Sequence, residues 1–414
     1  MTRALSFFLT FFLCMVGSLH AQETVVPADS AETAFVLLPD SSNFVTVSLM
    51  VATPGEEGYS ALGHCALRLE CPIHHLDYCF TFESRSETPW FNYLSFLTAN
   101  MSAGFTVAPT EAYINRFREE GRGMVQYPLN LKLHEEQELW RFLDTDWEQG
   151  AFRKFDFLRN NCTSVCLMAV ENVMWQVEGE KMEVKQWPVP MTFDNGHGII
   201  YLTRDAPWMQ FLLMALVGVE AEAYWPQVER MSPELVGEVL LHSSVMDAEG
   251  QVRPFVDGKP VKLLEQRLLP SHSPFTPNVV FLSLLVLVLL ITLAELLLHW
   301  ERLPKWLDIL LLTLQTLVGC FLLYISFVSN ILGAHWNWLL LLFNPLPFLL
   351  WLLFHKKKNF YRIYLFYAAV LALIVLGGSF VSCQFLLANR LIAATLAVRC
   401  VAVYVKKVNS RTRP

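Results

Sequence analysis

Hydrophobic and polar positions divide the chain into two parts with different periodicities. In the first part they alternate over 44–52, 65–70 and 76–83, the period-2 pattern of strands that bury one face. Residues 133–147 instead show the three-to-four spacing of an amphipathic helix. From residue 279 onward the chain is mainly apolar. The pattern predicts an α+β domain followed by an all-α membrane block.

Five apolar runs in the second part are each close to the ~20 residues that a helix needs to cross a bilayer. They cover 278–298, 307–328, 337–354, 363–382 and 385–405. Basic residues gather at 301–305, at 355–362 and in the tail after 405, whereas the connections near Asn330 and Ser382 hold none. Because cytoplasmic loops carry the excess of Lys and Arg, we expect the basic connections and the C-terminus in the cytoplasm.

The N-terminus predicts export by a separate argument. Residues 1–21 carry Arg3, then an apolar run, and end at Ala21, which is the pattern of a secretory signal peptide. The apolar core is short for a span, and an uncleaved anchor is the alternative. We expect a signal peptide (1–21), a periplasmic catalytic domain (22–275) and a five-helix transmembrane domain (276–414) in the inner membrane.

Composition supports a membrane protein. Of 414 residues, 54% are hydrophobic and 17% charged, which is too apolar for a typical soluble chain. The net charge of -7 gives no electrostatic basis for binding nucleic acid. Residues 207–219 are almost wholly apolar yet too short to span, so they predict a core helix or a helix on the bilayer surface.

Cys162 is the candidate nucleophile. An extended segment turns into a helix here, with Asn161 as the expected N-cap and Cys162 in the first turn. Backbone N–H groups and the helix dipole favour a thiolate at that position. The alternative is a small buried hydrophobe or half of a disulfide. A disulfide to Cys166 is poor, because Cα atoms four residues apart on a helix are near the geometric limit.

His64 is the candidate general base. A turn containing Gly63 leads into a strand that begins at His64. Thiolate chemistry needs an imidazole to accept the proton, and the two residues are commonly distant in sequence. His197 is a rival base in a glycine-flanked loop, without the context of a strand start.

The residue that would orient His64 depends on the register of the next strand. In one register the face opposite His64 carries Asp77 and Glu83, and in the other it carries Tyr78 and Ser84. We predict Asp77, because a carboxylate can steady an imidazolium. A structural carboxylate in a turn is the alternative reading of Asp77.

A metal site is a weaker reading of the same region. The candidate ligands are Cys65, Cys71, His74, His75 and Cys79. Their spacing matches no zinc pattern, and Cys71 and Cys79 flank a turn that a cross-strand disulfide could close. We predict no metal and no cofactor. Since five cysteines lie in the exported region, two disulfides would leave one thiol free.

Polar residues within the apolar runs suggest further roles. Glu295 and Arg399 lie near the predicted cytoplasmic ends and are expected to snorkel to the interface. Arg390 lies near an outer end, where it could hold a lipid phosphate. His335 lies near the outer leaflet, with interfacial anchoring as its alternative role. We take Asn161, Arg390 and His335 as candidate substrate-binding residues.

The order of the two catalytic candidates suggests a family. A histidine that opens a strand, followed later by a cysteine that opens a helix, resembles the circularly permuted NlpC/P60-type, papain-like group that includes lecithin:retinol acyltransferase. The motifs Gly63-His64, Asn160-Asn161-Cys162-Thr163, His335-Trp336-Asn337 and Asn344-Pro345-Leu346, with the signal peptide and membrane block, resemble the Lnb-type bacterial lipoprotein N-acyltransferases.

The resemblance implies a reaction and its partners. A fatty acyl chain would pass, from a phospholipid, to the free α-amino group of the lipid-modified N-terminal cysteine of a lipoprotein, with Cys162 as nucleophile and His64 as base. A membrane-anchored cysteine peptidase or amidase acting on cell-wall peptides is the alternative, although it gives no reason for five helices. A non-enzymatic membrane scaffold with a Cys162–Cys166 disulfide is a third possibility.

Overall fold

The computed structural model describes most of the chain after residue 44. The described residues are 45–55, 60, 62–84, 95, 101–155, 159–185, 194–223, 232–267, 274–298, 302–329, 334–357 and 359–412. The predicted signal peptide (1–21) and the first residues of the predicted periplasmic domain (22–44) lie outside them. The described residues contain an α+β part and, after it, a helical part, as the hydrophobic pattern predicts.

The α+β part is built on a seven-stranded antiparallel sheet with the order β10-β5-β1-β2-β3-β4-β6. Its strands are β1 (Thr46–Ala52), β2 (His64–Cys71), β3 (Leu76–Glu83), β4 (Ser102–Pro109), β5 (Met124–Pro128), β6 (Arg153–Lys154) and β10 (Val261–Leu264). The three strands expected from alternation are β1, β2 and β3, and each predicted limit falls within two residues of the observed one.

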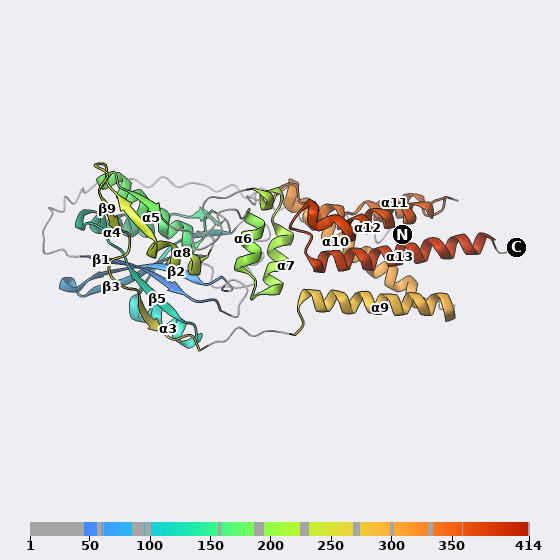
Figure 1. Ribbon diagram of the computed structural model, residues 1–414, viewed down its shortest axis with the longest axis horizontal. Helices are drawn as coiled ribbons and strands as arrows, with labels where there is room; N and C mark the ends of the chain where they lie inside the picture. The colour runs from blue at the N-terminus through green and yellow to red at the C-terminus, as the bar shows by residue number, and fades with distance from the viewer. Residues whose placement is uncertain are drawn as a thin grey trace. The chain divides into compact units, whose positions relative to one another are not determined.

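Helices cover both faces of this sheet (Figure 1). α4 (Leu133–Glu148), α5 (Cys162–Glu178) and α8 (Pro233–Leu241) pack over one face, and α3 (Thr110–Glu119) packs over the other. Successive strand residues point to opposite faces. Apolar side chains are buried on both faces of β1 and β2, not on one face as the alternation predicts. Leu67, for example, contributes to the core with α5, whereas its neighbour Ala66 packs with α3.

Short elements follow the sheet. They are β7 (Lys181–Val184), β8 (Ser243–Met246) and β9 (Val252–Pro254) in a second antiparallel sheet, and α6 (Asn195–Leu202), α7 (Pro207–Leu216) and η4 (Val219–Glu222). For residues 207–219 the sequence predicts either a core helix or a helix on the bilayer surface, and α7 has features of both. Leu213 and Met214 are buried, whereas Trp208 and Leu212 are 41% and 53% exposed. α7 therefore buries one face and leaves an apolar face uncovered.

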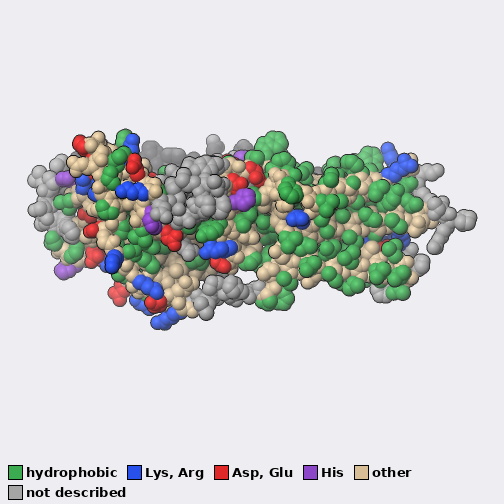
Figure 2. All heavy atoms as spheres, viewed as in Figure 1, with side chains coloured by type: hydrophobic (Ala, Val, Ile, Leu, Met, Phe, Trp, Pro, Cys, Tyr) green, Lys and Arg blue, Asp and Glu red, His purple; other side chains and the backbone are tan. Residues whose placement is uncertain are grey.

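The helical part consists of α9 (Pro277–Leu298), α10 (Arg302–Phe327), η6 (Trp338–Leu341), α11 (Leu346–Phe354), α12 (Arg362–Val381) and α13 (Leu387–Thr412). Within the described residues, α9, α10 and α12 are long and apolar enough to cross a membrane. Figure 2 shows hydrophobic side chains over most of the visible surface of these helices, with charged side chains mainly on the α+β part. Such an apolar surface is expected where lipid is the solvent.

The prediction of five comparable spans needs correction at 337–354. η6 ends at Leu341, and α11, which begins after Asn344-Pro345, has nine residues. The break faces protein, because the side chains of Gln315 and Tyr367 both donate to the Leu342 carbonyl at 3.2 Å. Non-helical backbone is tolerated at membrane depth when neighbouring helices satisfy its polar groups in this way. The predicted fifth segment, 385–405, corresponds to the single helix α13, which begins two residues later, at Leu387.

The snorkelling prediction for Glu295 and Arg399 is wrong. The Arg399 side chain is 4% exposed and donates to both carboxylate oxygens of Asp308, at 2.6 and 3.0 Å. It also donates to Glu295 at 2.9 Å and to the Thr292 hydroxyl at 2.8 Å. A guanidinium whose donors are met by neighbouring helices has no need to reach the interface. The network joins α13 to α9 and α10.

Candidate active site

Cys162 is the first residue of α5, and Asn161 is its N-cap, as predicted. The Asn161 Oδ1 accepts hydrogen bonds from the backbone N–H groups of Thr163 and Ser164, both at 2.9 Å. In return, the Ser164 hydroxyl accepts from the Asn161 N–H at 2.9 Å. This capping box fixes the helix start and with it the thiol. Asn161, predicted as a substrate-binding residue, uses its side-chain oxygen in this cap.

His64 is the first residue of β2, directly after Gly63. Gly63 has a φ of 90°, and a Cβ there would lie 2.7 Å from the Ala52 carbonyl oxygen. A residue with a side chain would be strained at that turn. The turn brings His64 close enough to Cys162 for each side chain to shift the pKa of the other. The Cys65 N–H is also close enough to the Cys162 sulfur to lower the pKa of this thiol.

Thr81 of β3 fixes the tautomer of His64. The Thr81 hydroxyl donates its hydrogen to the Cys65 carbonyl at 3.1 Å. Its Oγ1 also lies 2.6 Å from His64 Nε2, and having used its hydrogen it must accept there. His64 therefore carries a hydrogen on Nε2. Nδ1 of the neutral ring is then the acceptor that can take the Cys162 proton.

Glu83 lies next to the His64–Thr81 contact. Its Oε2 lies 4.0 Å from His64 Nε2 and 3.2 Å from Nη1 of Arg116, and its Oε1 accepts from the Thr106 hydroxyl at 3.0 Å. The register explains the proximity: Leu67 pairs with Phe80, so His64, three residues earlier, faces Glu83, three residues later. Thr81 and Glu83 are thus the polar groups beside His64 on β3.

The prediction that Asp77 orients His64 is corrected by this register. Asp77 pairs with Glu70 at the other end of β2. Its carboxylate accepts two hydrogen bonds from Arg68, both at 2.8 Å, and one from Thr110 at 2.6 Å. Asp77 shares a face of β3 with Thr81, but four residues of strand separate them by about 13 Å. The structural reading of Asp77 therefore holds.

Electrostatic interaction between Cys162 and His64 stabilises the thiolate–imidazolium ion pair. Burial alone would raise the pKa of Cys162. The His64 imidazolium and the Cys65 N–H lower this pKa by more than burial raises it, so it lies below the ordinary value of 9.0. Burial lowers the pKa of His64, but the Cys162 thiolate and the Glu83 carboxylate more than compensate, so its pKa lies above 6.5. Both shifts stabilise thiolate and imidazolium together.

Most backbone N–H groups at the start of α5 are already hydrogen-bonded within the cap. The N–H groups of Thr163 and Ser164 are occupied by the Asn161 side chain, and that of Val165 by the Asn161 carbonyl. Within the described part of the chain, the Cys162 N–H makes no hydrogen bond. It is therefore the backbone group at this helix start that remains available to a developing oxyanion.

Three other predicted residues lie elsewhere. Arg390 in α13 donates from Nε to the Val375 carbonyl at 2.9 Å, and His335 Nδ1 lies 3.0 Å from the Ser326 carbonyl. His197 belongs to α6 rather than to a loop, and no contact of these three residues with Cys162 is present among the described ones. The structure thus brings His64 and Cys162 together but adds neither Arg390 nor His335 to them.

The cysteine alternatives are also decided. All eight cysteines in the described residues are free thiols, so the proposed Cys71–Cys79 and Cys162–Cys166 disulfides do not form. Cys71 pairs across the hairpin with Leu76, and Cys79 pairs with Arg68. Among the described residues, Cys65, Cys71, His74, His75 and Cys79 do not gather within reach of one ion.

Alkylation of Cys162 tests the ion pair directly. The thiolate is the reactive form, so the rate of carboxamidomethylation at Cys162 should rise with a midpoint below pH 9.0, the ordinary thiol pKa. His64→Ala should move that midpoint upward, because the stabilising positive charge is lost. The measurement is peptide mass spectrometry after timed iodoacetamide treatment at a series of pH values.

Cys166 is an internal control for this experiment, since burial raises the pKa of its thiol well above the ordinary value. It should react slowly at every pH in both proteins. An unchanged Cys162 midpoint in His64→Ala would show that His64 does not influence the thiol.

These features define a class before any comparison. The chain is a membrane protein whose α+β domain holds an interacting cysteine and histidine, one at the start of a helix and the other at the start of a strand.

Comparison with family models gives the particular family. The model of the Lnb N-terminal periplasmic domain matches residues 40–193, and the model of the Lnb transmembrane domain matches residues 270–411. The chain belongs to the Lnb family, as its motifs suggested, and both His64 and Cys162 lie in the first match. It is therefore a membrane protein of a lipoprotein-processing family with an exported N-terminal domain. Searches of curated proteins and of solved structures found no match.

Proposed function

We propose that this protein is a lipoprotein N-acyltransferase. It moves a fatty acyl chain from a phospholipid, through a thioester on Cys162, to the α-amino group of the lipidated N-terminal cysteine of a lipoprotein. The observation that carries the proposal is the Cys162–His64 pair, with the tautomer of His64 set by Thr81, in a membrane protein of the Lnb family. The proposed partners are the phospholipid, the lipoprotein and the membrane.

The first half-reaction forms the thioester. Nδ1 of His64 takes the Cys162 proton, and the thiolate attacks the carbonyl carbon of the phospholipid ester. The Cys162 N–H donates a hydrogen bond to the oxygen that becomes negative in the tetrahedral intermediate. The imidazolium then gives its proton to the leaving alcohol oxygen, the C–O bond breaks, and a lysophospholipid departs.

The second half-reaction transfers the chain to nitrogen. The neutral α-amine attacks the thioester carbonyl, and a C–N bond forms as the C–S bond breaks. His64 Nδ1 accepts a proton from the amine and returns it to the departing sulfur. The thiol and neutral imidazole are restored without net change, so the cycle needs neither metal nor cofactor.

The apolar face of α7 is a suitable shelter for the acyl chain. Arg159, three residues before Cys162, donates to Glu220 of η4 at 2.9 Å, and η4 follows α7 in the chain. Trp208 and Leu212 of α7 are large, exposed and apolar. A chain held against such a surface would be protected from water, which otherwise competes with the amine for the thioester.

The proposed location follows from the charge pattern. We place the protein as a multi-pass protein of the inner membrane, with a periplasmic domain at 22–275 and a membrane domain at 276–414. The basic connection at 355–362 and the C-terminus face the cytoplasm in this arrangement.

The acceptor decides between transferase and hydrolase. Purified protein with phospholipid should convert a diacylglyceryl-cysteine peptide with a free α-amine into the corresponding N-acyl amide. The matched control is the same peptide with an acetylated α-amine, which should remain unmodified because it lacks a nucleophile. Mass spectrometry of the peptides reports both results. Cleavage of cell-wall peptides without transfer to the free amine would favour the peptidase or amidase.

Thr81 should act through His64. Thr81→Val retains the shape of the side chain but removes the acceptor for Nε2–H, which should reduce kcat by about tenfold, the value of one hydrogen bond. Asp77→Asn is the matched control on the same strand and should leave kcat within about twofold, because its carboxylate serves Arg68. The midpoint of the pH–kcat profile should move in Thr81→Val alone. A larger loss in Asp77→Asn would restore Asp77 as the orienting residue.

A further inference from the structure

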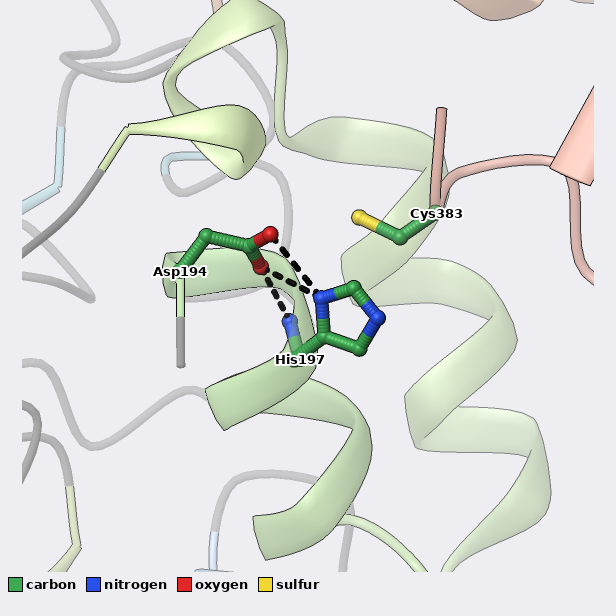
Figure 3. Close-up of side chains that lie close together, drawn as sticks. All are labelled: Asp194, His197 and Cys383. Atoms are coloured by element: carbon green, nitrogen blue, oxygen red, sulfur yellow. Dashed lines mark hydrogen bonds and ion pairs between the residues drawn. The ribbon is translucent and has the colours of Figure 1, made fainter. Parts of the chain in front are cut away.

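Three metal-ligating side chains from distant parts of the sequence meet outside the active site (Figure 3). Asp194 is the N-cap of α6, His197 lies in its first turn, and Cys383 lies in the connection between α12 and α13. One ligand atom from each lies within 4.8 Å of the other two. None of the three has a role in the proposed acyl transfer.

A second carboxylate joins this group. The Oε1 atom of Glu222, at the end of η4, lies 3.6 Å from the Cys383 sulfur. The same oxygen accepts a hydrogen bond from the Ser382 hydroxyl at 2.5 Å, which holds it beside the thiol. We refer to Asp194, His197, Glu222 and Cys383 as the α6–Cys383 cluster. It contains one sulfur, one imidazole and two carboxylates.

Local structure explains part of the cluster. Asp194 caps α6 by accepting the His197 N–H at 2.8 Å, and it also lies 2.8 Å from Nδ1 of His197. That pair alone is an ordinary helix cap. The cap does not explain why Cys383 and Glu222 come to the same place from two other segments. The carboxylates of Glu222 and Asp194 both lie beside the Cys383 thiol, so negative charge faces it.

We propose that the α6–Cys383 cluster binds a zinc-type divalent cation. Sulfur and imidazole nitrogen are poor ligands for Mg²⁺ or Ca²⁺ but favoured by Zn²⁺, which also accepts carboxylate oxygen. Bonds of about 2.0–2.3 Å place tetrahedral ligand atoms about 3.3–3.8 Å apart, so the separations of up to 4.8 Å among the ligand atoms of Asp194, His197 and Cys383 must close by about 1 Å. The His197 side chain is 55% exposed and has room to move. On binding, the Cys383 thiol loses its proton to solvent and a Zn–S bond forms.

The bound cation would connect separate elements. It would join α6 and η4 to the connection between α12 and α13, so its expected role is structural and separate from Cys162 and His64. The proposal does not depend on acyl transfer.

Metal content of the purified full-length protein tests the site. The protein is purified in detergent with a tag free of histidine, stripped with chelator, exposed to Zn²⁺ and desalted. The wild type should retain one Zn²⁺ per chain by mass spectrometry of the metal. Cys383→Ser and His197→Ala should each lose most of it, whereas Cys320→Ser, which alters a thiol of α10 outside the cluster, should retain it. Absence of retained zinc in the wild type, or equal retention in all four proteins, would overturn the proposal.

Two measurements on the wild type guard against misfolded variants. With Co²⁺ in place of Zn²⁺, a thiolate-to-cobalt charge-transfer band should appear in the near ultraviolet. Zn²⁺ should also slow maleimide labelling of Cys383, read at the peptide level, by at least about tenfold, and chelator should restore it. Labelling of Cys383 that is indifferent to Zn²⁺ would contradict the site.

Discussion

Cys162→Ser should reduce acyl transfer by at least about a thousandfold while the protein remains folded. Serine has nearly the same shape, so the N-cap and the start of α5 should persist. Its hydroxyl, however, does not ionise beside His64, so the nucleophile is lost. The measurement is kcat for transfer to a free-amine lipopeptide, with circular dichroism and thermal unfolding on the same sample.

His64→Gln should cause a loss of similar size for a different reason. A glutamine amide can still donate to Thr81, but it cannot accept a proton from the thiol. Cys320→Ser and His242→Ala change the same residue types away from the site and should retain activity within about twofold. Wild-type turnover by purified Cys162→Ser or His64→Gln would rule out the proposed pair.

Glu295→Ala should give the largest loss of stability, about 3–5 kcal/mol, because it leaves Arg399 buried without one of its partners. Arg399 also retains Asp308, so the protein should still fold in detergent. The free energy of unfolding is measured by denaturant titration in mixed micelles.

Lys406→Gln provides the matched control for this substitution. Lys406 pairs with the other oxygen of Glu295 at 3.2 Å, but its side chain is 38% exposed. Solvent screens such a pair, so its loss should cost at most about 1 kcal/mol. Equal losses of unfolding free energy in the two variants would show that the buried Arg399–Glu295 pair stabilises the protein no more than the exposed Lys406–Glu295 pair.

Local sequence signals were sufficient for the two central residues. An Asn before an apolar run marks a helix start, and that start places Cys162, because a cap is decided by residues within one turn. Gly63 is likewise a local signal, because a glycine can adopt the positive φ of the turn directly before β2, which begins at His64. Neither conclusion requires knowledge of distant parts of the chain.

The orienting residue needed the hairpin register, which the sequence left open. The turn Pro72–His75 sets the pairing of Cys71 with Leu76, and the same register continued beyond Leu67 and Phe80 places His64 opposite Glu83, 4.0 Å away. Asp77 and Glu83 lie on one face in that register, so chemistry alone could not choose between them. The distance along β3 excludes Asp77. No sequence signal indicates Thr81, because an uncharged hydroxyl has no distinctive pattern.

Contacts between distant segments account for the remaining errors. Arg399 looks like a snorkelling residue until α9 and α10 supply Glu295 and Asp308. The run at 337–354 looks like one helix until Gln315 is seen to satisfy a carbonyl at its break. Hydrophobic periodicity describes one segment at a time, so it cannot contain these partners.

The short helix η4 contacts both the segment before Cys162 and the α6–Cys383 cluster. Glu220 accepts from Arg159, close to Cys162, and Glu222 lies beside Ser382 and Cys383. A cation held by Glu222 would restrain the same short helix that contacts the segment leading to the nucleophile.

The intact mass of the protein after incubation with phospholipid alone tests the central claim most directly. Wild-type protein should gain the mass of one fatty acyl chain, located on Cys162 by peptide mapping and removed by neutral hydroxylamine, as a thioester is. Cys162→Ser should gain no hydroxylamine-labile mass. An unmodified wild-type mass under conditions in which lipopeptide is still N-acylated, or an acyl chain on any other residue, would contradict transfer through Cys162.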